Sequence, residues 1–85
     1  MAMQITGRRI TISDSLREYA EEKIGSAIKV MDWDPINVDV ILFRESNPAN
    51  QRPACCEVTL RFKDKIIRVE ENEEDLHTAI DVASA

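Results

Sequence analysis

The hydrophobic pattern changes its period at Ser13, and this change most constrains how the chain can fold. Before it, apolar and β-branched residues at positions 3–6 and 10–12 flank Gly7, which predicts an opening strand bent or interrupted at the glycine. After it, apolar residues recur at three- and four-residue spacing, which lines one helix face. They are Leu16, Tyr19, Ala20, Ile24, Ala27, Ile28 and Met31. Because Ser13 is a favourable N-cap, we predict a helix of about five turns that starts there.

The segment after this helix predicts three more strands. Asp32-Trp33-Asp34-Pro35 should end the helix, since proline disfavours helical geometry in the residue before it. Apolar and polar residues then alternate over residues 36–43 and 54–62, the pattern of a half-buried strand. A short turn at Lys63-Asp64 leads into a further strand over residues 65–70. Two prolines between the first two of these strands predict a mobile loop at residues 44–53.

A second helix is predicted at the end of the chain. Asn72 is its expected N-cap, with Asp75 three residues later as a weak capping box. Its apolar stripe is Leu76, Ala79, Ile80 and Ala83. It reaches Ala85 without a C-cap glycine or a cationic last turn, so we expect a truncated helix that continues in the natural protein.

This order of elements predicts one α+β domain over residues 1–85. Eighty-five residues suffice for one domain with a modest core. The order β-α-β-β-β-α favours two layers, a four-stranded sheet with both helices packed on one face. Double-stranded-RNA-binding domains are similar in topology. No segment is apolar enough to span a membrane and no secretory pattern is present, so we expect a soluble, cytoplasmic protein.

The net charge of −5 comes from one local cluster. Its members are Glu70, Glu71, Glu73, Glu74 and Asp75. The remaining eleven Lys and Arg balance the remaining eleven Asp and Glu. We expect the cluster to lie at the start of the second helix, where carboxylates oppose the positive end of the helix dipole.

The residues that carry catalytic or metal chemistry do not form a recognisable site. Cys55 and Cys56 are adjacent, so in a strand they point to opposite faces and make a poor disulfide. Together with the distant His77 they lack the ligand spacing of a zinc site. No nucleophile–base order and no phosphate-binding loop is present. We therefore expect no cofactor, no metal and no enzymatic activity.

Several short strings occur in the same order, and at matching separations, as in one known family. They are Ile5-Thr6-Gly7-Arg8, Leu16-Arg17-Glu18-Tyr19, Glu22-Lys23-Ile24, Val38-Asp39-Val40, Cys56-Glu57-Val58, Arg68-Val69-Glu70 and Asp75-Leu76-His77-Thr78-Ala79-Ile80-Asp81. With them, nearly the whole chain resembles the N-terminal domain of the ribosome hibernation promoting factors. This family is also called the ribosome-associated inhibitors or sigma-54 modulation proteins.

The resemblance implies a protein that binds the small ribosomal subunit. It would occupy the channel of messenger and transfer RNA and silence ribosomes under stress or in stationary phase. Such a protein needs cations that meet ribosomal RNA phosphates. The family-like positions available for RNA binding are Arg8, Arg17, Lys23, Arg44, Arg52, Arg61, Lys63 and Arg68.

A different class of function fits the acidic balance. A protein-interaction module of the same fold could form a homodimer through its free sheet face, where Ile41, Phe43 and Ile66 would be exposed, or through an edge strand. In that case the cations only solvate the surface or pair with nearby carboxylates. Salt separates the two alternatives, because phosphate contacts weaken steeply as salt is added.

Overall fold

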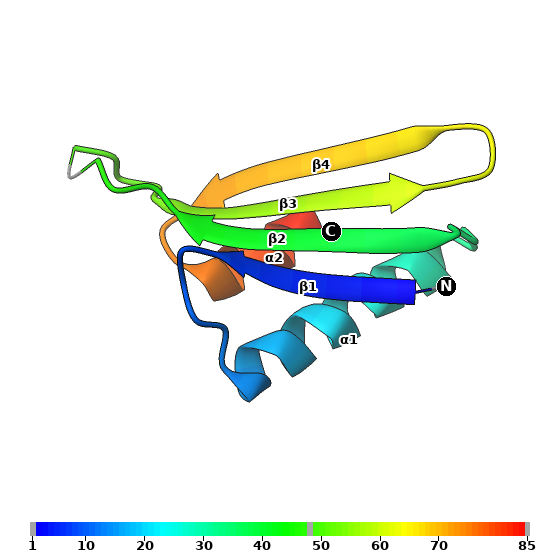
Figure 1. The fold of residues 1–85 in the computed structure, drawn as a ribbon, viewed down its shortest axis with the longest axis horizontal. Coiled ribbons are helices and arrows are strands. Elements are labelled where there is room, and N and C mark those ends of the chain that lie inside the picture. The colour runs from blue at the N-terminus through cyan, green and yellow to red at the C-terminus, as the bar shows by residue number, and fades with distance from the viewer. Residues whose placement is uncertain (1, 48, 85) are drawn as a thin grey trace.

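The computed structural model describes residues 2–47 and 49–84 and contains the six predicted elements in the predicted order. They are β1 (Ala2–Arg8), α1 (Asp14–Val30), β2 (Asn37–Arg44), β3 (Ala54–Arg61), β4 (Ile66–Glu73) and α2 (Leu76–Ala83). The sheet order is β1-β2-β3-β4 (Figure 1). Successive hairpins pair β2, β3 and β4 antiparallel, whereas β1 pairs parallel with β2. A parallel pair needs a long crossover, which α1 supplies.

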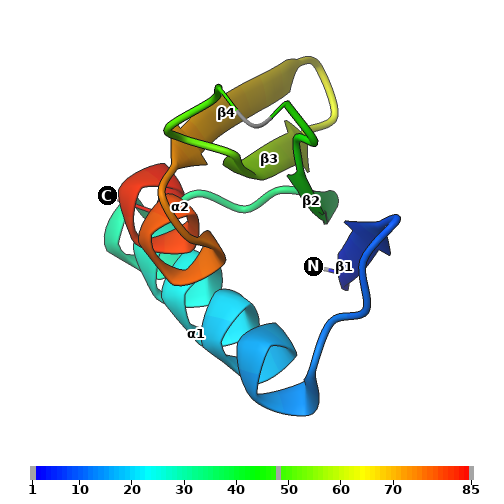
Figure 2. The same cartoon turned by 90° about the vertical axis from the view of Figure 1, so that its left-hand side faces the viewer.

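Both helices cover the same face of the sheet, as Figure 2 shows, so the α+β two-layer prediction is confirmed. The opposite face carries no helix in the described part of the chain, and we refer to it as the open face. The topological likeness to double-stranded-RNA-binding domains stays a prediction.

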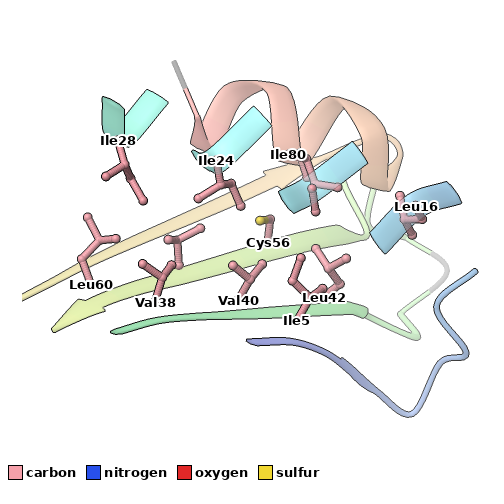
Figure 3. Close-up of a cluster of buried hydrophobic side chains, with 13 residues drawn as sticks. Ile5, Leu16, Ile24, Ile28, Val38, Val40, Leu42, Cys56, Leu60 and Ile80 are labelled. Atoms are coloured by element: carbon pink, nitrogen blue, oxygen red, sulfur yellow. The ribbon is translucent and has the colours of Figure 1, made fainter. Parts of the chain in front are cut away.

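The core lies between the sheet and the helices (Figure 3). Its side chains are Ile5, Leu16, Ala20, Ile24, Ile28, Val38, Val40, Leu42, Cys56, Val58, Leu60, Ala79 and Ile80. The predicted α1 stripe is confirmed except at its end, where Met31 is the C-cap and is 51% exposed. Strict alternation along β2 places every second side chain in this layer, which is why the strand pattern was readable from the sequence.

Helix α1 begins at the predicted N-cap, but its C-terminus is formed by backbone hydrogen bonds and not by the predicted effect of Pro35. The Ser13 hydroxyl accepts a hydrogen bond from the Leu16 N–H at 3.2 Å. At the other end Asp32 has a φ of 57°, the left-handed conformation. Its N–H donates to the Lys29 carbonyl at 3.0 Å, and the N–H of Trp33 donates to the Ile28 carbonyl at 3.2 Å. These two bonds form a Schellman motif. The helix therefore ends at its C-cap, Met31, and Pro35 is not what terminates it.

Gly7 does not bend the first strand, which corrects the sequence prediction. Strand β1 continues through Gly7 to Arg8, and the turn follows at Arg9, whose φ is 60°. A Cβ on Gly7 would lie 2.6 Å from the Ile10 carbonyl oxygen and 2.9 Å from Cγ1 of Ile12. Residues 10–12 are therefore not strand but cross closely over β1, and Ile10 and Ile12 pack against the core.

The boundary between β4 and α2 also differs from the prediction. Strand β4 extends to Glu73, because its pairing with β3 persists until Glu73 lies opposite Ala54. Asn72 is consequently a strand residue, and Asp75 is the N-cap of α2. Its carboxylate accepts a hydrogen bond from the Thr78 N–H at 2.8 Å.

The acidic cluster is split by this shift of the boundary. Glu70, Glu71 and Glu73 are strand residues, and only the last two members, Glu74 and Asp75, lie next to the helix start. The predicted placement of the whole cluster at the helix dipole was wrong. Most of its negative charge belongs to the β4 edge of the sheet instead.

The two glycines provide a test of this packing. We expect Gly7→Ala to lower the free energy of unfolding by about 1–3 kcal/mol, because the added methyl overlaps backbone and side-chain atoms. Gly25→Ala in α1 is the matched control, since its Cβ would meet nothing within 4 Å. It should raise the free energy of unfolding by about 0.5–1 kcal/mol. Urea unfolding of the two variants measures both changes; equal effects would contradict the close crossing at Gly7.

Candidate nucleic-acid interface

Three of the eight predicted RNA-binding cations lie on the open face. The pairing register places Arg8, Arg61 and Arg68 there, on three different strands. The Arg8 guanidinium lies 4.8 Å from the centroid of the Phe43 ring and 3.8 Å from the Glu57 carboxylate. A cation stacked on an aromatic ring is held without losing its exposed edge. This geometry orients Arg8 on the sheet surface.

Carboxylates on the same face balance these cations. Arg61 Nε lies 3.5 Å from Asp39 Oδ2. Arg68 lies opposite Thr59 and makes no ion pair with any residue of the described ranges. With Asp39, Glu57 and Glu70 on it, the face carries as many acidic as basic side chains. Surface ion pairs of this kind are weak and can be exchanged for phosphate contacts.

Two of the predicted cations are engaged on α1. Arg17 Nη1 donates to the Ile5 carbonyl at 2.8 Å and so ties the first turn of α1 to the edge strand β1. Lys23 Nζ lies 3.8 Å from the Asp81 carboxylate on α2. Both side chains therefore also hold elements of the domain together. Sequence spacing alone did not indicate either partner.

The other three cations are at the ends of the sheet. Arg44 is the last residue of β2. Its side chain is on the helix side of the sheet, because it lies opposite the buried Ala54. Arg52 is in the loop before β3, and Lys63 is in the turn between β3 and β4. None of these three forms an ion pair within residues 2–47 and 49–84. The eight cations thus occupy both faces and both ends and do not converge on one patch, and their RNA-binding role stays a prediction.

A small polar cluster joins the two helices beside Lys23. The Tyr19 hydroxyl donates a hydrogen bond to the Asp81 carboxylate, and the Tyr19 and His77 rings lie 4.9 Å apart. This hydrogen bond is the main reason that the pKa of Tyr19 is raised above its ordinary value, since it stabilises the neutral phenol. Tyr19 packs partly against the core, as predicted, and its polar end stays at the surface.

Glu45 holds the base of the loop between β2 and β3. Its N–H donates to the Pro53 carbonyl at 2.8 Å. Its carboxylate accepts hydrogen bonds from the side-chain amides of Asn50 at 2.7 Å and Asn72 at 3.4 Å. The Cys55 thiol donates to the same carboxylate at 3.6 Å. We call these four side chains the Glu45 clasp; it connects the loop that carries Arg52 to β3 and β4.

The two cysteines are free thiols on opposite faces of the sheet, as predicted. Cys56 is in the core, where burial is the main cause that raises its pKa to about 12. Cys55 is on the open face but is buried, and burial together with the Glu45 carboxylate raises its pKa to about 11. In the described part of the chain, no three His, Cys, Asp or Glu side chains gather as they would around a metal ion.

A shallow apolar groove of about 200 Å³ lies between the ends of both helices and β4. Its lining includes Met31, Trp33, Ile67, Val69 and Val82, with Glu71 at its border. Trp33 also packs edge-on against Phe62, with 5.9 Å between the ring centroids. Within the described ranges, no helix combines the length and the apolar character needed to cross a bilayer.

Residues 3–85 match the family described as Sigma 54 modulation protein / S30EA ribosomal protein. The chain belongs to this family. The match covers the six elements described above except Ala2, the first residue of β1, and it confirms the resemblance found in the sequence.

Named relatives agree with this assignment. A chloroplastic ribosome-binding factor from Spinacia oleracea is 33% identical over 84 residues, which are 95% of this chain and 28% of the relative. A ribosome hibernation promotion factor from Deinococcus radiodurans is 35% identical over 81 residues, which are 95% of this chain and 42% of the relative. The chain thus spans less than half the length of these curated relatives.

Solved structures of similar proteins share the fold. The N-terminal domain of Protein Y from Thermus thermophilus superposes with a TM-score of 0.77 at 28% identity, covering 99% of this chain and 88% of that one. A ribosomal subunit interface protein from Coxiella burnetii gives a TM-score of 0.81 at 21% identity, covering 99% of this chain and 86% of that one. The second match concerns the fold alone.

The Glu45 clasp predicts how the Cys55 thiol reacts. We expect Glu45→Ala to speed the reaction of Cys55 with a disulfide reagent at mildly alkaline pH, because the variant removes a hydrogen-bond acceptor and a carboxylate that both disfavour the thiolate. Below the pKa of the thiol, each unit by which that pKa falls raises the thiolate fraction by about tenfold. In a Cys55→Ala background, Cys56 should react at the same slow rate with or without Glu45. An unchanged Cys55 rate would mean that the clasp does not control this thiol.

Proposed function

We propose that this protein is a ribosome-associated hibernation factor of the cytoplasm that binds small-subunit ribosomal RNA in the channel of messenger and transfer RNA and inhibits translation under stress or in stationary phase. The observation that carries the proposal is the family match over residues 3–85. The names of the two relatives at 33% and 35% identity, which refer to ribosome binding and to ribosome hibernation, support the ribosomal partner. The protein acts by occupying a site, without catalysing a reaction.

The contact with RNA is made by single cations and not by one strongly basic patch. Arg44, Arg52, Lys63 and Arg68 form no ion pair with the described residues, so they can meet phosphates without breaking one. Arg8, Lys23 and Arg61 exchange weak surface pairs for phosphate oxygens. Such contacts position the protein through the RNA backbone and carry little sequence information.

The alternative, a homodimerising interaction module, gains support from only one of its two proposed surfaces. On the open face the side chains of Ile41 and Phe43 are half-buried. Ile66 is exposed, with 59% of its surface accessible to solvent. This face lacks the extended apolar patch that a stable interface needs. The edge strand β4 remains available for self-association.

Co-sedimentation with purified small ribosomal subunits tests the ribosomal proposal. We expect binding that weakens steeply with added salt, with a log–log slope close to the number of phosphates neutralised. Arg52→Glu and Lys63→Glu lie outside regular structure and should each weaken binding and reduce the salt slope by about 1. A longer version of the protein that extends beyond residue 85, measured in parallel, shows whether segments outside residues 1–85 add to the binding.

Lys29→Glu is the matched control. Lys29 is an exposed cation of α1 that is not among the predicted RNA contacts, so the same change of net charge should affect binding much less there. An equal loss of binding in all three variants would mean that only the net charge of the protein matters, and not the position of the cation. Absence of binding by both chain lengths, at low and physiological salt, would contradict the proposed function.

A further inference from the structure

The outer edge of β4 is an unpaired strand with a self-complementary charge pattern. Strand β4 pairs with β3 on one side, and Figure 2 shows no described element beyond it on the other. An open edge presents free N–H and C=O groups that can pair with another strand. Charged side chains normally protect such an edge from its own copies. Here their order along the strand decides whether they repel or attract a second copy.

Four charged residues in or next to β4 have opposite signs at equal distances from Val69. Arg68 and Glu70 flank Val69 by one position on each side. Lys65, the residue just before β4, and Glu73, the last residue of β4, flank it by four. In an antiparallel pair of two β4 strands centred on Val69, Arg68 of each copy lies opposite Glu70 of the other, and Lys65 lies opposite Glu73. Opposite charges in directly facing positions stabilise a strand pair. Each side of the centre therefore has one attractive pair within the strands, Arg68 with Glu70, and a second at the strand end, Lys65 with Glu73.

The neighbouring registers that keep the helices of both copies on one face of the joined sheet lose this complementarity. Moving the centre by one residue in either direction places Arg68 opposite Arg68 or Glu70 opposite Glu70. The Val69-centred register also offers Glu70 an opposite charge, Arg68 of the second copy. Within its own sheet Glu70 lies opposite Glu57, a like charge. Two apolar residues lie opposite polar ones in this register. Ile67 lies opposite Glu71, which is partly buried at the border of the apolar groove, and Ile66 lies opposite Asn72.

The apolar side chains at this edge fit the same partner. Ile67 and Val69 point toward the helix side and line the groove, and Val82 of α2 beside them is 39% exposed. A second β4 strand brings its own Ile67 and Val69 to this groove and shields it from water. The groove is open to solvent in the isolated chain and is continuous with the strand edge.

We propose that two copies of this chain associate through antiparallel pairing of their β4 strands centred on Val69, which joins two four-stranded sheets into one eight-stranded sheet. The partner is a second copy because the charge pattern complements itself. This inference goes beyond the ribosomal proposal and does not depend on it. Since Arg68 is also a predicted RNA contact, the paired form withholds this cation from phosphates.

Charge exchange at Arg68 and Glu70 tests the pairing. In sedimentation velocity at increasing protein concentration, the wild-type chain should dimerise. Arg68→Glu and Glu70→Arg should each weaken the dimer by about tenfold or more, because either change places two like-charged pairs across the interface. An equimolar mixture of the two variants should dimerise again, as should the double variant, since both restore opposite charges. Arg9→Glu, an exposed cation beyond the opposite edge strand β1, is the control and should dimerise like wild type.

Each other outcome contradicts the proposal. A wild-type chain that is monomeric at all concentrations excludes the association. A dimer that both single variants retain is held by another surface. Single variants that lose the dimer but fail to recover it in the mixture exclude the Val69-centred register, and circular dichroism of each variant shows whether the chain is folded. Ribosome co-sedimentation is a separate measurement, so failure here leaves the ribosomal proposal intact.

Discussion

The packing of the α1 stripe against the central strands β2 and β3 is the interaction on which the rest of the domain depends. Ile24 and Ile28 of α1 are buried together with Val38, Val40 and Leu60 of the sheet. In a chain of 85 residues this single layer supplies most of the apolar burial, and so it determines which face of each strand is dry. Because strand side chains alternate, the same packing determines which side chains remain for partners.

Strand parity therefore governs the surface chemistry. Arg8, Arg61 and Arg68 lie on the open face because their neighbours in sequence are required on the helix side. Arg44 follows the opposite parity and lies at the helix side near the start of α2. The cations are distributed by the demands of the core, and this explains why they do not gather into one patch. It also places Arg68 and Glu70 together at the edge of the sheet.

Local sequence signals predicted much of the fold. The Ser13 cap, the helical period of α1 and the alternation in β2 and β3 each depend on residues close in sequence, and all were confirmed. The cap of α2 was misplaced because Asn72 and Asp75 are both good caps, and pairing of β4 with distant β3 residues decides between them. At Gly7 the sequence indicated a special backbone position. The reason, that residues 10–12 cross close to Gly7, depends on the three-dimensional structure and could not be predicted from the sequence.

The candidate interface was less predictable than the fold for the same reason. Composition identified the cations, yet their partners come from distant segments, such as Asp81 for Lys23. The Glu45 clasp also joins segments that are far apart, since Asn72 reaches it from β4. Glu45 directly follows β2, and Asn72 lies on the open face of β4. Only the register of three strands shows that they meet at Cys55.

The parallel pairing of β1 has a consequence for how the domain is made. Strand β1 is synthesised before the other described elements, but its neighbour in the sheet is β2, which follows the whole of α1 in the chain. During synthesis β1 must wait for α1 and β2 before its backbone is paired, whereas β2, β3 and β4 can form hairpins as soon as they emerge. Strand β1 therefore depends on α1 and β2, which follow it in the chain, for its place in the sheet. The pairing of β1 with β2 is a non-local step, whereas the pairings of β2 with β3 and of β3 with β4 join consecutive strands.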